Sequence, residues 1–332
     1  MIPLFRAQDV AAAVSPERAV EAVRDAFLAY HRGEWSMPPK VYVPAYPAGD
    51  FRAMPALGGG HASLKWVTSY PGNPARGLPT VMGVVLLSDA ADGQLVAILD
   101  AATVTALRTG AAAVLAAETL GRPRSAAGTP GSRPGGAGFA DAASSPGTAA
   151  VVGAGVNGKA AARTFLARGQ QVMLWDVDPA RAEAAAEELG ASVAASREEA
   201  LAADRLVTMT PGHEVLLPEG SLRPGQHVSL MGADGPGKAE IAVAELARAR
   251  VFCDDWEQAS HNGELAHALA AGAVTRADVT ELGAVLAGEA AGRRGDDEIT
   301  AFDSTGLAIQ DLAIALAAVA RAGDLDLPHI EL

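Results

Sequence analysis

The feature that most constrains the fold of this chain is an apolar run at 149–152 that leads into the glycine-rich turn GAGVNG at 153–158. A helical pattern follows at 159–168. A strand, a tight turn and a helix in this order are typical of a unit that binds a dinucleotide. Gly153 permits the sharp turn, Gly155 leaves space for a pyrophosphate, and Gly158 lets the helix pack close to the strand. Free N–H groups at the start of such a helix bind phosphates.

A second apolar run, at 171–175, supports this interpretation. It ends in Asp176, about twenty residues beyond the glycines. A carboxylate at that place accepts hydrogen bonds from an adenosine ribose and repels a 2′-phosphate, so the predicted cofactor is NAD. Arg181 keeps NADP open as an alternative, because an arginine can bind a 2′-phosphate. The competing interpretation, a glycine turn in another kind of α/β protein, is disfavoured by the matching elements on both sides.

Length and charge narrow the class of protein. A chain of 332 residues is most simply two domains. The net charge of −13 argues against nucleic acid or an anionic membrane surface as a partner. Cys253 is the only cysteine, which excludes internal disulfides and a cysteine zinc site, and the histidines show no metal-binding spacing. No secretory signal or membrane-spanning run is visible, so we expect a cytoplasmic protein without a metal.

The first part of the chain predicts a mostly antiparallel sheet flanked by helices. A helix is expected from Ser15 to Gly33, because Ser15 suits an N-cap and Pro16 the first helical turn. A second helix is expected at 102–120. Between the helices lie strand-like runs, with a hairpin signal at Asp92-Gly93 before the last of them. These runs are 40–45, 51–56, 63–69, 80–87 and 95–100.

Residues 122–147 differ from the rest, since they are rich in Gly, Pro, Ser and Ala and lack periodicity. We interpret them as a flexible linker, with docking of Phe139 as the alternative. Beyond them strands alternate with helices, which predicts a doubly wound parallel sheet. Further helices are expected at 265–271, 278–288 and 306–322. The predicted fold class is α/β: a Rossmann-type doubly wound parallel sheet plus an α+β domain. Its parallel strands are expected at 149–152, 171–176, 205–210, 227–232 and 250–254.

Cations that interrupt apolar segments are the first candidates for chemistry. Lys65 lies inside the strand SLKWVTSY, and Arg108 lies among alanines and leucines of the helix at 102–120. Lys40 and Arg52 lie near the starts of strands in the same domain. Together these four could grip a substrate carboxylate, with arginine offering bidentate geometry. The alternative for each is a surface cation or a charge paired with a local carboxylate.

An acidic candidate lies on the cofactor side. Asp234, in the segment GADGPGK, follows the strand predicted at 227–232, where an aspartate can hold an amine or activate water as a general acid or base. The alternative is an aspartate that only caps its loop. Thr210 and Gly232 fall at the carboxyl ends of predicted strands, where ligands bind in such sheets.

From the first domain to the last helix the chain resembles the ornithine cyclodeaminase/μ-crystallin family. The resemblance is carried in order by MPPKVYVP, FRAMPA, LKWVTSYPGNPARGLPTVMG, ALRTGAAA, VVGAGVNG, GADGPGK and FDSTGLAIQDLAIA, while 122–147 departs from the family pattern. It implies a substrate-binding and dimerisation domain at 1–121, completed by 303–332, and an NAD-binding domain at 148–302. It therefore implies a homodimer.

The resemblance also implies roles for individual residues. Lys40, Lys65 and Arg108 would meet the substrate carboxylate, Arg52 would belong to the same site, and Asp234 would handle the amine or the attacking water. The residues expected to contact the cofactor are Gly153, Gly155, Val156, Asn157, Gly158, Asp176, Thr109, Thr210, Met231, Gly232, Lys238 and Ser304.

Arg52 separates the branches of the family. Ornithine cyclodeaminases carry a glutamate at this place, where it meets the ammonium of the ornithine side chain, and an arginine would repel that ammonium. The segments MPPK, RAMPA and GADGPGK look most similar to the alanine dehydrogenases of the family. The resemblance thus implies an NAD-dependent dehydrogenase that oxidatively deaminates L-alanine, or a similar small amino acid, reversibly to the 2-oxo acid and ammonia.

Three other functions stay open at this point. An ornithine cyclodeaminase would form L-proline and ammonia without net redox change. An NAD(P)H-dependent ketimine reductase would share every residue named above and differ in the shape of its pocket. A non-enzymatic protein that binds NAD(P)H and a small ligand would show binding without turnover.

Overall fold

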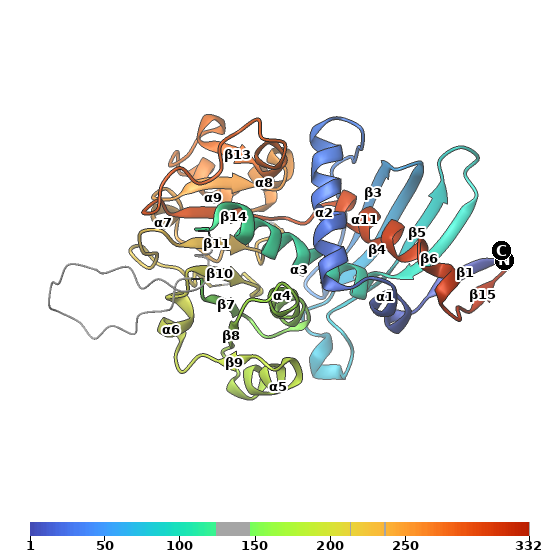
Figure 1. Ribbon diagram of the computed structural model, residues 1–332, viewed down its shortest axis with the longest axis horizontal. Helices are drawn as coiled ribbons and strands as arrows, with labels where there is room; N and C mark the ends of the chain where they lie inside the picture. Colours follow the sequence, from blue (N-terminus) through green and yellow to red (C-terminus); the bar gives the residue numbers. More distant parts are fainter. Residues whose placement is uncertain (124–146, 213, 236, 332) are drawn as a thin grey trace, which may run out of the picture.

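The computed structural model describes residues 1–123, 147–212, 214–235 and 237–331. Within them the chain forms two sheets, and α3, the long helix Ala101–Leu120, runs from one sheet to the other (Figure 1). The predicted linker at 122–147, with Phe139, falls almost entirely outside the described residues. No helix of the described residues has the length and apolar character that crossing a membrane requires.

The N-terminal sheet is mostly antiparallel, as the sequence predicted. Its order is β15-β1-β6-β5-β4-β3-β2, and only the β1–β6 pair is parallel. The strands are β1 Ile2–Phe5, β2 Val41–Ala45, β3 Gly49–Gly58, β4 His61–Ser69, β5 Val81–Asp89, β6 Leu95–Asp100 and β15 His329–Ile330, and the helices before them and within this part are α1 Ala7–Ala13, α2 Pro16–His31 and the 3-10 turn η1 Asn73–Arg76.

The two predicted helices of this part begin as their sequence indicated. Ser15 caps α2 by accepting a hydrogen bond from the backbone N–H of Arg18 at 3.2 Å. Asp100 caps α3 in the same way, accepting from the N–H of Thr103 at 2.7 Å. Each cap satisfies a backbone donor that the helix itself leaves free.

The second sheet is wholly parallel, which confirms the predicted doubly wound arrangement. Its order is β13-β12-β14-β11-β10-β7-β8-β9. Its strands are β7 Ala149–Val152, β8 Val172–Trp175, β9 Ser192–Val193, β10 Arg205–Thr208, β11 His227–Leu230, β12 Arg250–Cys253, β13 Val279–Glu281 and β14 Thr300–Asp303, and its helices are α4 Val156–Ala167, α5 Pro179–Leu189, α6 Arg197–Leu201, α7 Val243–Leu246, α8 Trp256–Asn262, α9 Glu264–Ala270 and α10 Leu282–Leu286.

Two predictions near the C-terminus are wrong. The helix expected at 278–288 is replaced by the strand β13, which pairs in parallel with β12, and by the short helix α10. The strand β14 was missed altogether, although it lies between β11 and β12 in the sheet. Both errors have one cause: the partners of these strands lie far away in the sequence, where local periodicity carries no information.

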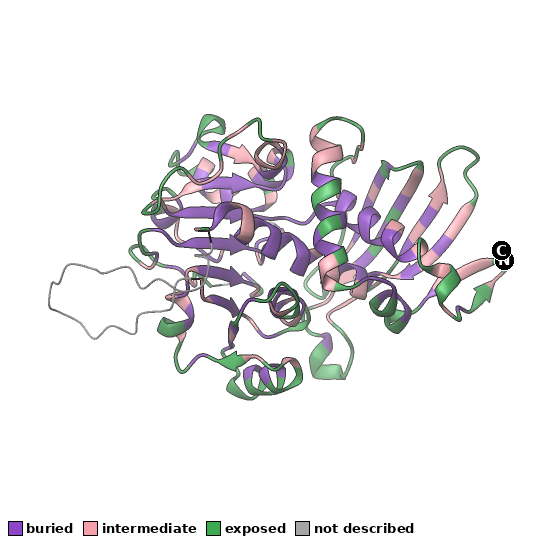
Figure 2. Cartoon of the chain, viewed as in Figure 1, coloured by how far each residue is buried: buried purple, intermediate pink, exposed green. Residues whose placement is uncertain are grey.

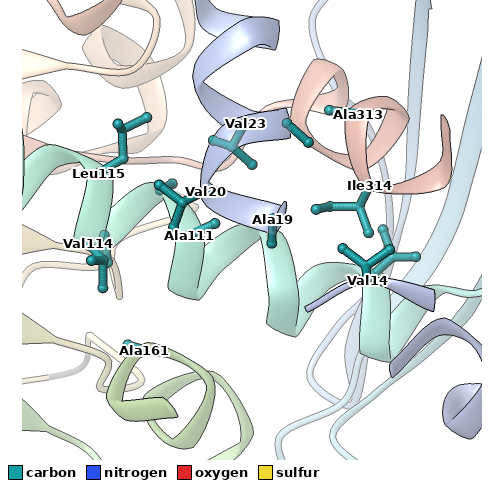
Figure 3. Packing of buried hydrophobic residues seen from close by; sticks show 14 of the residues in the cluster. Val14, Ala19, Val20, Val23, Ala111, Val114, Leu115, Ala161, Ala313 and Ile314 are labelled. Atoms are coloured by element: carbon teal, nitrogen blue, oxygen red, sulfur yellow. The ribbon is translucent and has the colours of Figure 1, made fainter. Parts of the chain in front are cut away.

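The last helix, α11 Ala308–Val319, returns to the N-terminal domain. It is shorter than the predicted 306–322 because Gly306 has a left-handed backbone with φ +74°. It packs against α2, α3, β3 and β4. Figure 3 shows the core that results, with Val20 and Val23 of α2, Val114 and Leu115 of α3 and Ile314 of α11. This core fixes α3 and α11 under the N-terminal sheet.

Close packing also fixes the join between the two sheets. A Cβ atom on Gly110 of α3 would lie 2.7 Å from the backbone carbon of Ala160 in α4. Only a glycine lets these two helices approach so closely. The approach brings the start of α4 toward one face of the N-terminal sheet. We call this the inner face; it carries Arg52, Met54, Lys65 and Val67.

Candidate active site

The glycine-rich turn between β7 and α4 has the geometry that a dinucleotide needs. Gly153 has φ +102°, and a Cβ there would lie 2.6 Å from the carbonyl oxygen of Met209. A Cβ on Gly158 would lie 1.7 Å from the carbonyl oxygen of Gly153, so the helix packs onto its own turn. A Cβ on Gly155 would meet nothing within 4 Å. The space that a pyrophosphate would require is therefore open above the N-terminus of α4.

Asp176 lies beside this turn, directly after β8. One carboxylate oxygen accepts a hydrogen bond from the N–H of Ala154 at 2.8 Å, and the other accepts from the N–H of Asp178 at 2.9 Å. Arg181, the residue that favours NADP as an alternative, forms ion pairs with Asp176 at 3.3 Å and with Asp178 at 3.6 Å. The carboxylate is thus held at the edge where an adenosine ribose would lie.

A cleft opens where the inner face of the N-terminal sheet meets the carboxyl ends of the parallel strands. Its volume is about 90 Å³. All five predicted catalytic residues line it, as do four of the predicted cofactor contacts. The lining residues are Lys40, Arg52, Met54, Lys65, Val67, Thr68, Ser69, Val81, Thr105, Arg108, Thr109, Asn157, Met231, Asp234, Ser304, Thr305 and Gly306.

The other predicted cofactor contacts do not line this cleft. Gly153, Gly155, Val156, Gly158 and Asp176 lie at the ends of β7 and β8 and the start of α4, Thr210 and Gly232 follow β10 and β11, and Lys238 donates to Asp234 of the lining. This arrangement follows the strand-end edge of the sheet, along which a dinucleotide extends in this kind of fold.

The floor of the cleft alternates charged and apolar side chains. In the register of β3 and β4, Arg52 pairs with Val67 and Met54 pairs with Lys65. All four side chains are buried and lie on the same face, because alternate residues of a strand point the same way. The two cations therefore stand on one diagonal and the two apolar side chains on the other.

Lys65 and Arg108 share a buried carboxylate that the sequence analysis missed. Asp311 of α11 lies 2.7 Å from the Nζ of Lys65 and 3.5 Å from the Nε of Arg108. Burial lowers the pKa of Lys65 to about 8, although Asp311 opposes this shift. The Nε of Arg108 makes no hydrogen bond within the described residues. Asp311 thus pairs with both cations, and its contact with Arg108 is too long for a hydrogen bond from the Nε atom.

Arg52 is more heavily paired than the sequence analysis expected. It donates to the two carboxylate oxygens of Asp50 at 2.7 and 3.3 Å and to Asp234 at 2.6 Å. Burial alone would lower the pKa of Arg52, but the two carboxylates raise it above its usual value. Its guanidinium also lies 5.3 Å from the centre of the Tyr42 ring. In this structure Arg52 therefore holds Asp234 in place across the cleft.

Asp234 is held from both sides. Its second carboxylate oxygen accepts a hydrogen bond from Lys238 at 2.6 Å, and the hydroxyl of Tyr42 donates to its backbone carbonyl at 3.1 Å. Burial would raise the pKa of Asp234, but Arg52 and Lys238 hold it well below its usual range. The carboxylate is therefore ionised at neutral pH and can only accept hydrogen bonds.

Lys40 differs from the other cations of the cleft. Its Nζ donates to the carbonyl oxygen of Thr305, and within the described residues it forms no ion pair. Burial lowers the pKa of Lys40 to about 8, with Asp234 and Asp254 opposing the shift. The positive charge of Lys40 is therefore available to pair with an anionic ligand.

A second carboxylate missed by the sequence analysis joins the strand ends. Glu240 accepts hydrogen bonds from the hydroxyl of Thr208 at 2.6 Å, from the N–H and hydroxyl of Thr210 at 2.9 and 2.6 Å, and from the N–H of Gly232 at 2.8 Å. It is fully buried. Because its donors come from both β10 and β11, it fixes the spacing of the strand ends at which Thr210 and Gly232 lie.

Two more acids, Asp303 and Glu264, are buried, and their pKa values are raised. Burial raises the pKa of Asp303 to about 8 and that of Glu264 to about 9. Among the described residues no group of His, Cys, Asp and Glu side chains has an arrangement that could hold a metal ion. The chemistry that this site offers is therefore that of a cationic, carboxylate-bearing cleft beside a dinucleotide turn.

Comparison with known proteins decides the family. The model of the ornithine cyclodeaminase/mu-crystallin family matches residues 4–127 and 139–323. The chain belongs to this family. It is 41% identical over 317 residues to an alanine dehydrogenase of Archaeoglobus fulgidus, covering 93% of this chain and 91% of that one. It is 32% identical over 328 residues to an iminosuccinate reductase of Paracoccus denitrificans, covering 94% of each chain.

A solved structure of the family agrees with the fold. An archaeal alanine dehydrogenase dimer with bound NAD superposes with a TM-score of 0.83 at 38% identity, covering 97% of this chain and 96% of that chain. The family resemblance that the motifs indicated is thereby confirmed, and so is the fold class. The roles assigned to the individual site residues remain predictions.

Proposed function

We propose that this protein is an NAD-dependent dehydrogenase that converts L-alanine, or a similar small amino acid, reversibly to the 2-oxo acid and ammonia. One observation carries the proposal: a single cleft beside the dinucleotide turn holds the cations Lys40, Lys65 and Arg108 together with the ionised Asp234. An amino acid offers a carboxylate to the first set and an amine to the second. The relationship to an alanine dehydrogenase at 41% identity supports the same activity.

The charges of the cleft suit a substrate that carries a carboxylate. Asp234 pairs with Arg52 and Lys238, Asp50 pairs with Arg52, and Asp311 is shared by Lys65 and Arg108. Lys40 has no carboxylate partner within the described residues and donates to the backbone carbonyl of Thr305. These five cations face three paired carboxylates, so positive charge remains for the carboxylate of a ligand at neutral pH.

The amine would be held by Asp234. Because its pKa is well below the usual range, this carboxylate stays ionised and orients the amine of the substrate, and later the water that attacks the imine, by accepting hydrogen bonds. Arg52 stands beside it and would repel a second ammonium, as in ornithine. The side chain of the substrate would then face Met54, Val67 and Val81, the apolar part of the lining. This arrangement favours a small apolar amino acid.

The residues present fit NAD as the cofactor. The open space at Gly155 and the N-terminus of α4 would receive the pyrophosphate, and Asp176 would accept hydrogen bonds from the adenosine ribose. Asn157, Met231, Thr109 and Ser304 line the cleft where the nicotinamide end would lie. When bound, the cofactor supplies the acceptor for the hydride that leaves the Cα of the substrate. The related archaeal structure with bound NAD supports this choice.

The chain's own residues would carry out the remaining steps. The cations fix the carboxylate, so that the Cα hydrogen points toward the strand ends of the parallel sheet. The amine first releases a proton to solvent, and loss of hydride then leaves the protonated imine, whose nitrogen stays beside Asp234. Water held by Asp234 adds to the imine carbon, a proton passes from that water to the nitrogen, and ammonium departs to leave the 2-oxo acid. The reverse sequence is reductive amination.

We further infer that the protein is a homodimer formed through the outer face of the N-terminal sheet. Leu64, Trp66, Met82 and Val84 are neighbours on this face and remain 36–39% exposed, and Phe51 stacks on Trp66 with ring centres 5.5 Å apart. Exposed positions alternate with buried ones along these strands (Figure 2). Contiguous apolar patches of this kind mark contact sites. A second copy is the occupant that the related dimeric alanine dehydrogenase supports.

Purified protein tests the proposed activity directly. NADH absorbance is followed with NAD and L-alanine, with NAD and L-ornithine, and with NADH, pyruvate and ammonium. We expect NADH formation with alanine and NADH consumption with pyruvate and ammonium. Formation of proline from ornithine without net NADH would instead identify a cyclodeaminase. Reduction of a cyclic imine alone would identify a ketimine reductase, and NADH binding without any turnover a binding protein.

A further inference from the structure

A buried carboxylate outside the cleft organises one of its walls. Asp254 directly follows β12 and is 2% exposed. One of its oxygens accepts hydrogen bonds from the hydroxyl of Ser304 at 3.0 Å, from the N–H of Thr305 at 2.8 Å and from the N–H of Gly306 at 2.9 Å. Its other oxygen accepts from the N–H of Asp255 at 2.8 Å. Asp254 therefore fixes three consecutive residues, which we call the 304–306 turn.

The 304–306 turn also contacts two cations of the cleft. The carbonyl oxygen of Thr305 accepts the hydrogen bond from Lys40. Gly306 lies against Arg108 so closely that a Cβ there would be 2.4 Å from a terminal guanidinium nitrogen. Ser304, Thr305 and Gly306 all line the cleft, whereas Asp254 does not. A shift of the turn would therefore move the contact that positions Lys40 and the surface that confines Arg108.

We propose that Asp254 is a positioning residue of the substrate site, which sets Lys40 and Arg108 for the substrate carboxylate by fixing the 304–306 turn. The proposal rests on the proposed function in so far as that carboxylate belongs to an amino acid or 2-oxo acid. Asp254 itself touches neither the substrate nor the cofactor. Its effect should appear in substrate affinity more than in cofactor affinity.

The hydrogen-bond pattern shows why a carboxylate is needed at this position. Three donors converge on one oxygen of Asp254, and two more, the N–H of Asp255 and the hydroxyl of Thr305, reach the other oxygen. An asparagine of the same shape would have to place its NH₂ group against the N–H groups of the turn or against the N–H of Asp255. In either orientation one donor faces another donor, and the turn or its anchor must shift.

The chain offers a matched control in the next residue. Asp255 is 5% exposed, and its oxygens accept from the hydroxyl of Tyr30 and from the N–H of Gln258 at 3.0 Å each. It caps α8 and has no hydrogen bond to the 304–306 turn. Asp254→Asn and Asp255→Asn thus remove the same charge from neighbouring buried positions, and only the first alters the turn.

The experiment compares these two variants with the unmodified protein. We measure KM and kcat for L-alanine, the dissociation constant of NADH, and the dissociation constant of oxamate, a carboxylate analogue of pyruvate, from the NADH complex. For Asp254→Asn we expect KM and the oxamate constant to rise roughly tenfold to a hundredfold, the range for loss of a charged hydrogen bond. The dissociation constant of NADH should change less than about threefold in Asp254→Asn, well below that range. Asp255→Asn should change the oxamate constant by less than about threefold as well.

Two results would overturn the proposal: equal effects of the two variants on oxamate, or a loss of NADH affinity in Asp254→Asn as large as the loss of oxamate affinity. If Asp254→Asn does not fold, Asp254→Glu keeps the charge but displaces the carboxylate from the 304–306 turn, and an unchanged oxamate constant would then count against the proposal. Failure of the proposed function is a separate outcome, since it appears as absent alanine-dependent NADH formation in the unmodified protein. The oxamate constants of the variants remain interpretable in that case.

Discussion

The two faces of the strands β3, β4 and β5 reverse the usual distribution of side chains. On the inner face Arg52 and Lys65 are buried, with 9% and 1% of their surface exposed. On the outer face Trp66 and Val84, which are paired in register, are 39% and 38% exposed. Charged side chains are ordinarily found outside and large apolar ones inside. We infer that the two faces of a sheet that inverts this rule bind different partners.

The inner face is stable because its charges are paired. Asp50 and Asp234 offset Arg52, and Asp311 offsets Lys65. A buried charge without such a partner would cost far more than it contributes. The exposed side chains of the outer face are apolar, and within the described residues nothing covers them. They would be buried only by contact with another surface. The comparison thus separates the face to which we assign a charged ligand from the face on which we propose that a second subunit packs.

Removal of a cation from the inner face should have the largest effect. Lys65→Met leaves Asp311 buried beside Arg108 alone, and we expect kcat/KM for alanine to fall about a thousandfold or more, consistent with about 4 kcal/mol for breaking a buried pair. Steady-state kinetics and thermal unfolding measure the two consequences. The conservative variant Lys65→Arg serves as the control: it keeps a cation beside Asp311 and should retain stability and part of the activity. Unchanged activity in Lys65→Met would remove Lys65 from the site.

A charge placed on the outer face should separate the subunits. Trp66→Asp puts a carboxylate in the centre of the apolar patch and also removes the stacking with Phe51. We expect the dissociation constant of the dimer, measured by analytical ultracentrifugation, to rise about a hundredfold, as for an interface residue of high energetic weight. Val193→Asp on β9, a position that is 42% exposed, is the matched control and should leave the dimer intact. Equal behaviour of both variants would place the interface elsewhere.

The inner face should also impose a pH limit on substrate binding. Burial lowers the pKa of Lys40 and of Lys65 to about 8, so both are charged below that pH and lose their protons above it. Oxamate binding to the NADH complex should therefore weaken by up to about tenfold per pH unit for each group above pH 8. In Lys40→Arg the onset should stay near pH 8 but the loss should fall to about tenfold per pH unit, because arginine stays protonated and only Lys65 still titrates. A flat profile from pH 7 to 10 would show that neither ammonium contributes.

The smallest effect is expected from trimming the apolar part of the inner face. Val81→Ala enlarges the space where we place the substrate side chain. The ratio of kcat/KM for 2-oxobutanoate over pyruvate should rise about tenfold, the discrimination typical of one methylene group. Val84→Ala removes the same atoms from the outer face of the same strand and should leave this ratio unchanged. If both ratios move together, Val81 does not contact the substrate.

Local patterns in the sequence predicted the parts of the molecule that depend on nearby residues. The turn at Gly153, Gly155 and Gly158 and the carboxylate of Asp176 lie within one short segment, and the structure agrees with their expected geometry. The cap of α2 by Ser15 was predicted for the same reason. Lys65 and Arg108 were noticed because cations inside apolar segments are unusual.

The parts that were missed depend on distant partners. Asp311, Glu240 and Asp254 look like ordinary acids in the sequence, and only the fold brings Lys65, Thr210 and the 304–306 turn to them. Arg52 is an exception, because a charge paired with a local carboxylate was among the alternatives for it. Asp50 precedes it by two residues, and the alternation of a strand places both on one face.

The transfer of hydride from the substrate tests the central claim most directly. L-alanine deuterated at Cα is incubated with NAD and the purified protein, and the NADH formed is analysed by mass spectrometry. We predict that each NADH carries one deuterium and that pyruvate and ammonia appear in equal amounts. Deuterium-free NADH, or no NADH while ornithine is converted to proline, would contradict an amino acid dehydrogenase acting in this cleft.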